Sequence, residues 1–92
     1  MPKLYLPTIM RRDVGNRSRV VIPGQTVGSV LSQLVADFPD VQAHLLDETG
    51  HMRPHINVFV NGNDIRTLQG PETALAERDE VSLIPAMAGG SR

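Results

Sequence analysis

The feature that most constrains the fold is one amphipathic stretch between Thr26 and Pro39, TVGSVLSQLVADFP. Its apolar residues recur every three or four positions, which is the spacing of one face of an α-helix: Val27, Val30, Leu31, Leu34, Val35 and Phe38. Thr26 is a good N-cap because its hydroxyl can accept a hydrogen bond from an unpaired N–H of the first turn. Pro39 ends the helix just after Phe38. A helix with one apolar face requires a second layer to bury that face.

Short strand-like runs on both sides of this helix predict the second layer. KLYLPTIM and RVVIPG precede the helix, and a charged segment with the turn signal Gly15-Asn16 lies between them, so together they predict a hairpin. Pro7 lies in the first run, so its strand is expected to be short or to lie where the missing N–H is not needed. After the helix, INVFV leads into the tight-turn pair Asn61-Gly62, and a brief strand is expected at Ile65-Arg66. EVSLIP forms the last strand. Short helical turns are expected in DVQAHLLDETG and in GPETAL.

The element order β-β-α-β-β-β predicts an α+β fold in which one mixed sheet is covered by one main helix. If the first hairpin and the last strand pair in the middle of that sheet, the fold is a β-grasp, the ubiquitin-like arrangement. The pattern alone also allows other small α+β sheets. We expect the β-grasp domain to span residues 1–86, followed by a flexible tail over residues 87–92 that contains a Gly-Gly pair.

Composition excludes several classes of function. The 92 residues suffice for one domain, and a formal net charge of -1 provides no general basic field for nucleic acid. The absence of cysteine excludes disulfides, thiolate metal sites, iron–sulfur clusters and cysteine catalysis. The apolar N-terminal stretch is too short and too interrupted by proline for a signal peptide or a membrane helix. We therefore expect a cytoplasmic protein that does not associate with membranes.

No group of residues predicts catalysis or metal binding. His51 and His55 are four positions apart, but Pro54 prevents the helical spacing that would bring them together, so surface histidines are expected. The acidic pairs at Asp47-Glu48 and Asp79-Glu80 adjoin turns and fit solvated loops. The chain contains neither a G-x-S-x-G elbow nor a phosphate-binding loop. We expect a protein that is not an enzyme and binds no cofactor itself.

Strand alternation suggests a docking surface. If the buried residues of the last strands face the helix, then Phe59 and Ile84 lie on the open side of the sheet, and Tyr5 is expected to join them. Such a patch would anchor a partner, although isolated exposed apolar residues need no function. A basic cluster, Arg11, Arg12, Arg17 and Arg19, fits a solvated hairpin tip or a surface that steers an acidic partner.

Two segments are the most specific of the chain: INVFVNGNDIR, from Ile56 to Arg66, and TALAERDEVSLIPAMAGG, from Thr73 to Gly90. They resemble segments of the ubiquitin-like sulfur carriers of the ThiS/MoaD family, and the resemblance covers nearly the whole chain. The opening LPTIMRR and the helix start GQTVGSVLSQL look closest to the CysO-type branch, which serves cysteine synthesis. One departure is Arg78, where family members commonly have glycine before the aspartate. The turn there is expected to differ locally, since a positive φ would strain arginine.

The resemblance implies that Gly90 is the working residue. An ATP-dependent enzyme of the ubiquitin-activating type would adenylate its carboxylate, and sulfur would replace AMP to give a thiocarboxylate. A biosynthetic enzyme would then take the sulfur for cysteine, molybdopterin, thiamine or a natural product, with a cysteine-synthase-like acceptor favoured. Ala88, Gly89 and Gly90 would thread into the partner's active site, where glycine avoids side-chain clashes.

Ser91 and Arg92 follow the glycine pair and keep the Gly90 carbonyl in an amide. The resemblance implies that a JAMM-type metalloprotease removes them, although they would also fit an inert extension. Two other functions stay open: a protein modifier conjugated through Gly90, and a β-grasp interaction module in which the tail has no role.

Overall fold

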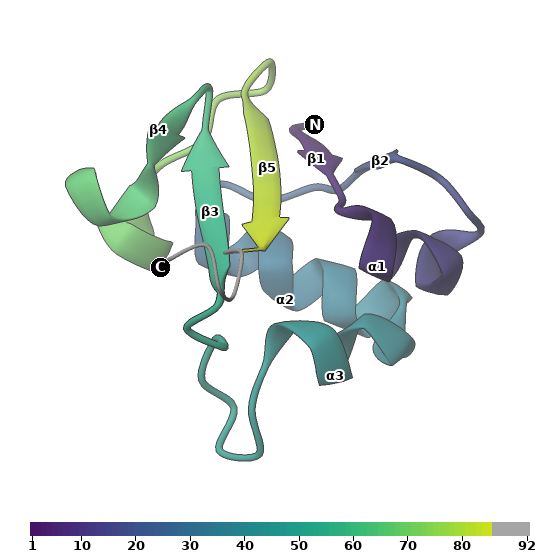
Figure 1. Ribbon diagram of the computed structural model, residues 1–92. Helices are drawn as coiled ribbons and strands as arrows, with labels where there is room; N and C mark the ends of the chain where they lie inside the picture. Colours follow the sequence, from purple (N-terminus) through teal and green to yellow (C-terminus); the bar gives the residue numbers. More distant parts are fainter. Residues whose placement is uncertain (86–92) are drawn as a thin grey trace.

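A computed structural model describes residues 1–85 of the chain (Figure 1). Five strands form one mixed sheet in the order β2-β1-β5-β3-β4. Their bounds are Lys3–Tyr5 for β1, Arg19–Val21 for β2, Ile56–Val60 for β3, Asn63–Asp64 for β4 and Glu80–Pro85 for β5. β1 runs parallel to β5, and the other neighbouring strands are antiparallel. The first and last strands therefore pair inside the sheet, which confirms the predicted β-grasp.

The helix α2, Val27–Asp37, lies behind the sheet as the sequence predicts (Figure 1). Its N-terminus is closed by a capping box: the Thr26 hydroxyl accepts from the Ser29 N–H at 3.1 Å, and the Ser29 hydroxyl accepts from the Thr26 N–H at 3.0 Å. Two one-turn helices, α1 (Thr8–Arg11) and α3 (Gln42–Leu45), accompany it. The 3₁₀ turns are η1 Arg12–Val14, η2 Pro39–Val41, η3 Ile65–Thr67 and η4 Gly70–Glu72.

One hydrophobic core fills the space between α2 and the sheet. Val27, Val30 and Leu34 of α2 have no exposed surface. On the sheet side, β3 and β5 present buried pairs in register, Val58 opposite Leu83 and Val60 opposite Val81. The apolar residues that recur every three or four positions in α2 therefore pack against those that recur every second position in β3 and β5, as the sequence pattern predicts.

One predicted strand differs from the structure. The strand expected at Ile65-Arg66 is wrong: β4 ends at Asp64, and Ile65 begins η3. Asn61 and Gly62 take positive φ values of 50° and 88°, so the two-residue turn returns the chain to the sheet at once. The Asp64 carboxylate then accepts from the Arg66 N–H at 2.8 Å, which caps the 3₁₀ turn and ends the strand.

The first run, KLYLPTIM, forms a short strand, as its proline predicts. β1 ends at Tyr5, and Pro7 stands at the N-cap of α1 with an extended backbone. A proline lacks the N–H that a strand would need, and this absence costs nothing at the start of a helix. The chain therefore leaves the sheet here, although β5 continues beyond this point.

The turn at Arg78 does not require a left-handed backbone. Among residues 1–85, the non-glycine residues with positive φ are Asn16 and Asn61. The Asp79 N–H donates to the Ala76 carbonyl at 3.1 Å, which closes a turn around Glu77 and Arg78. Arginine can adopt such a turn without strain, so the departure from the family pattern is accommodated locally.

Candidate functional site

The open face of the sheet carries one row of side chains that crosses all five strands. Register places Tyr5 and Phe59 in this row on either side of Ser82, and both are half-buried. The complete row, from β2 to β4, is Arg19, Tyr5, Ser82, Phe59 and Asp64. Neighbouring residues such as Leu4 and Val81 point to the core instead. The predicted placement of Tyr5 and Phe59 on the open side is therefore confirmed.

Ile84 lies on the same face, opposite Asn57 in the next row, and is 46% exposed. On its other side β1 has already ended, because its last pair with β5 joins Tyr5 to Ser82. The missing neighbour leaves a surface hollow of about 500 Å³, whose walls include Tyr5, Pro7, Ile9, Ile84 and Pro85. The hollow thus forms because β1 ends at Tyr5, two residues before Pro7, whereas β5 continues to Pro85.

The structure divides the predicted docking residues. Tyr5 and Ile84 line the hollow, whereas Phe59 lies outside its lining, one strand further across the sheet. Ile9, which is 47% exposed, was not among the predicted docking residues because no helix was expected after Pro7. It lies on α1, which begins at Thr8 with Pro7 at its N-cap and no side-chain capping hydrogen bond.

The hollow lies where the chain enters its C-terminal segment. Pro85, the last residue of β5, is part of the wall. The residues predicted to act in sulfur transfer, Ala88, Gly89 and Gly90, lie outside the described part of the chain, as do Ser91 and Arg92. Pro85, in the wall of the hollow, nevertheless precedes Gly90 by only five positions, so a partner bound in the hollow contacts the chain close to Gly90 in the sequence.

The other end of β5 is fixed by Asp79. Its carboxylate accepts from the Ala76 N–H at 2.7 Å and from the Asn61 side-chain amide at 3.0 Å. These hydrogen bonds, that from Ala76 first, hold the pKa of Asp79 below its ordinary value. The Asp79 carbonyl also accepts from the Lys3 N–H at 3.1 Å. Asn61 exchanges two further bonds with Glu80, so β5 starts from a position tied to both neighbouring strands.

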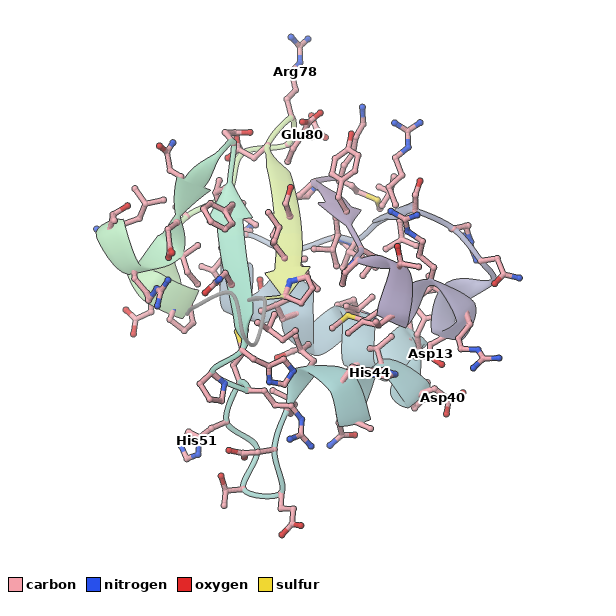
Figure 2. All side chains as sticks on the ribbon, viewed as in Figure 1. Asp13, Asp40, His44, His51, Arg78 and Glu80 are labelled. Atoms are coloured by element: carbon pink, nitrogen blue, oxygen red, sulfur yellow. The ribbon has the colours of Figure 1, made fainter. Side chains whose placement is uncertain are left out.

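The three histidines lie in different surroundings. His44 Nε2 is 3.2 Å from Asp13 Oδ2, which links α3 to η1, whereas His51 Nδ1 is 2.8 Å from the Thr49 hydroxyl (Figure 2). Within residues 1–85, no three His, Asp or Glu side chains are grouped in a way that could hold a metal ion. In the same residues, no helix has the length and apolar character needed to cross a membrane.

Comparison with known proteins identifies the family. The model of the ThiS family matches residues 5–90, which is nearly the whole chain. The chain belongs to the ThiS family. The predicted resemblance is thereby confirmed, and the ThiS-family match ends at Gly90, the residue that the sequence analysis singled out.

Relatives of this ThiS-family chain include sulfur carriers. It is 37% identical over 87 residues to the sulfur carrier protein CysO of Mycobacterium tuberculosis, covering 92% of this chain and 94% of that protein. It is 42% identical over 65 residues to the small archaeal modifier protein 3 of Haloferax volcanii, covering 71% of this chain and 70% of that protein. A crystal structure of an Amycolatopsis orientalis BexX/CysO complex matches with a TM-score of 0.86 and 30% identity, covering 98% of this chain and all of that one. The chain is therefore a sulfur carrier with a ubiquitin-like β-grasp fold.

Proposed function

We propose that the sulfur is carried on the backbone carboxylate of Gly90. The observation that supports this most directly is the ThiS-family match, which runs through the Gly-Gly pair and ends at Gly90. A carboxylate oxygen attacks the α-phosphate of ATP and pyrophosphate leaves; a sulfide-equivalent nucleophile then attacks the acyl carbon and AMP leaves, which gives a thiocarboxylate. Adenylation is required because a free carboxylate is a poor electrophile.

The partner enzymes supply the catalysis, and this chain supplies recognition and the reactive terminus. ATP binds to an activating enzyme of the ubiquitin-activating type, not to the carrier. Tyr5, Phe59 and Ile84, with the hollow beside β5, form the docking surface, and Ala88 to Gly90 enter the partner's active site. The two glycines keep this segment narrow enough for a confined channel.

Residues beyond Gly90 must be removed before activation. While Ser91 and Arg92 remain attached, the Gly90 carbonyl is part of a peptide bond and offers no carboxylate to ATP. A JAMM-type metalloprotease is the proposed processing enzyme. The full-length chain is then an inactive precursor, and trimming controls how much carrier enters the sulfur pathway.

A biosynthetic enzyme in the cytoplasm takes the sulfur, and a cysteine-synthase-like acceptor is our first candidate. Support comes from the 37% identity to CysO over most of both chains. The solved BexX/CysO complex also provides a precedent for a similar chain that assembles with a second protein.

A second candidate function is protein modification through Gly90. The similarity to a small archaeal modifier protein over 65 residues favours it. The two functions share the activated Gly90 and differ only in the final nucleophile, which is sulfur in one and a lysine amine in the other. The sequence has a single lysine, Lys3, so the conjugation of one copy of this chain to another has few target amines.

Intact-protein mass spectrometry tests the proposal. A chain that ends at Gly90 is incubated with candidate activating enzymes, ATP and a sulfide source, beside the full-length chain as the control. We expect a gain of about 16 Da in the Gly90-terminated chain, since SH replaces OH, and no gain in the full-length chain. A full-length chain that gains this mass at Arg92, or a trimmed chain that never gains it, would overturn the assignment of Gly90. Lysine-linked adducts would support the modifier function.

A further inference from the structure

Charge is distributed unevenly along the chain and therefore across the sheet. The first 25 residues carry five Lys or Arg side chains and one acidic side chain, Asp13, whereas residues 26–85 carry three Arg and nine acidic side chains. The first segment forms β1, α1, η1 and β2, which occupy one side of the sheet opposite β4 and η3 (Figure 1). A net charge of -1 conceals this separation.

Two of these cations lie beside the hollow. Arg11 is part of its wall, and its side-chain Nε donates to the Leu6 carbonyl at 3.1 Å, which fixes the side chain there. Arg19 lies directly opposite Tyr5 in the antiparallel pair, on the same face of the sheet. Lys3 is on the same face but lies two residues further from the hollow, opposite Glu80. We call Arg11 and Arg19 the basic border.

One acidic side chain approaches this border. Glu80 lies opposite Lys3 in the parallel pair of β1 and β5, and its carboxylate accepts from the Tyr5 hydroxyl at 3.4 Å. Lys3 compensates the charge of Glu80, so the border keeps the positive charges of Arg11 and Arg19. The opposite carboxylate of the row, Asp64, lies at the far edge and is paired with Arg66.

The apolar residues and the charges together define the chemistry of a partner. Ile9 and Ile84, which are 47% and 46% exposed, both contribute apolar surface to the lining of the hollow. An apolar side chain seated against them would lose contact with water, and carboxylates around it would meet the basic border. Such charges would also attract the partner before contact and orient it.

We infer that the hollow and its basic border bind a partner protein through an apolar side chain flanked by carboxylates. This inference rests on the proposed function for the identity of the partner as an activating or sulfur-accepting enzyme. Five residues separate Pro85 from Gly90, so a partner docked here lies within about 18 Å of the reactive terminus along the extended chain. Acidic residues around the entrance of the partner's active site would complement the carrier.

The test uses nuclear magnetic resonance on the ¹⁵N-labelled full-length chain with two defined probes. One is the blocked peptide Glu-Asp-Leu-Phe-Asp-Glu, and the other is the blocked peptide Lys-Arg-Leu-Phe-Arg-Lys. We expect the acidic peptide to shift the amide signals of Ile9 and Ile84 and to bind at least about fivefold more tightly than the basic one. Its affinity should fall as ionic strength rises, because salt screens exposed charges.

Two charge reversals complete the design. Arg19→Glu should abolish the preference for the acidic peptide, whereas the matched control Arg78→Glu, in the exposed turn far along the sheet, should retain it (Figure 2). Equal affinities for both peptides, shifts confined to other residues or no shifts at all would overturn the inference. Sedimentation that shows this face occupied by a second copy would also overturn it. The experiment needs neither ATP nor Gly90, so its failure is distinguishable from failure of the proposed function.

Discussion

The carboxylate of Asp79 is expected to contribute measurably to the stability of the fold, because it fixes the start of the strand that leads to the tail. Asp79→Ala removes the acceptor of two hydrogen bonds, from the Ala76 N–H at 2.7 Å and from the Asn61 amide at 3.0 Å. A net contribution of about 0.5–1.5 kcal/mol for each bond, taken toward its lower end because the site is open to water, predicts a loss of about 1–2 kcal/mol. For a domain of this size that corresponds to a decrease in Tm of about 4–16 °C.

The effect should depend on pH in a defined direction. The hydrogen bonds lower the pKa of Asp79 in the folded state relative to its ordinary value of 3.8. A depressed pKa contributes stability above the unfolded-state pKa, and that stability is lost as the pH falls through the folded-state value. The difference between the parent chain and Asp79→Ala should therefore be full at neutral pH and should shrink below about pH 4.

Urea denaturation followed by circular dichroism, at neutral pH and at a series of acidic pH values, measures both quantities. Glu77→Ala is the matched control, since Glu77 lies in the same turn with its side chain 88% exposed and should change stability little. An Asp79→Ala variant as stable as the parent at neutral pH would refute the anchoring role. A loss of equal size at neutral and acidic pH would instead refute the role of the ionised carboxylate.

Three further perturbations test the core, the helix cap and the docking surface. Leu34→Ala empties a fully buried position of α2 and should cost about 2–5 kcal/mol in the free energy of unfolding, measured in urea; a loss below 1 kcal/mol would contradict the packing. Thr26→Ala breaks the capping box and should cost about 1 kcal/mol, with a double-mutant cycle against Ser29→Ala showing strong coupling between the two hydroxyls. Ile84→Asp should leave the circular dichroism spectrum unchanged, because the side chain is 46% exposed, and should slow thiocarboxylate formation at least about tenfold; an unchanged rate would refute its part in docking.

Much of the fold could be predicted because local patterns and tertiary packing agree in this chain. The spacing from Val27 to Leu34 predicted α2, and its cap at Thr26 was correct. Alternation predicted β3 and β5 and placed Ile84 on the open face. In these elements the apolar periodicity matches the packing of a helix on a sheet, so the local preference and the tertiary packing favour the same structure.

Errors arose where one side chain decides between two local structures. Ile65 and Arg66 are compatible with a strand, but the Asp64 carboxylate captures the Arg66 N–H and begins a 3₁₀ turn. Ile9 was missed because β1 gives way to α1 after Pro7. In both cases the apolar pattern was short. A side-chain cap from Asp64 decided the first, and a proline without an N–H for the sheet decided the second.

The sequence by itself determined the helix, the main strands, the Gly-Gly motif and the family, because each depends on residue type and order along the chain. Tertiary structure decided which surface residues become neighbours. Tyr5 and Phe59 are far apart in sequence and share a row only because β1 and β3 both pair with β5. The hollow exists because β5 extends beyond β1, and its basic border forms because β2 returns Arg19 to the side of Tyr5. Pairing and strand length set these positions, and no local pattern encodes them.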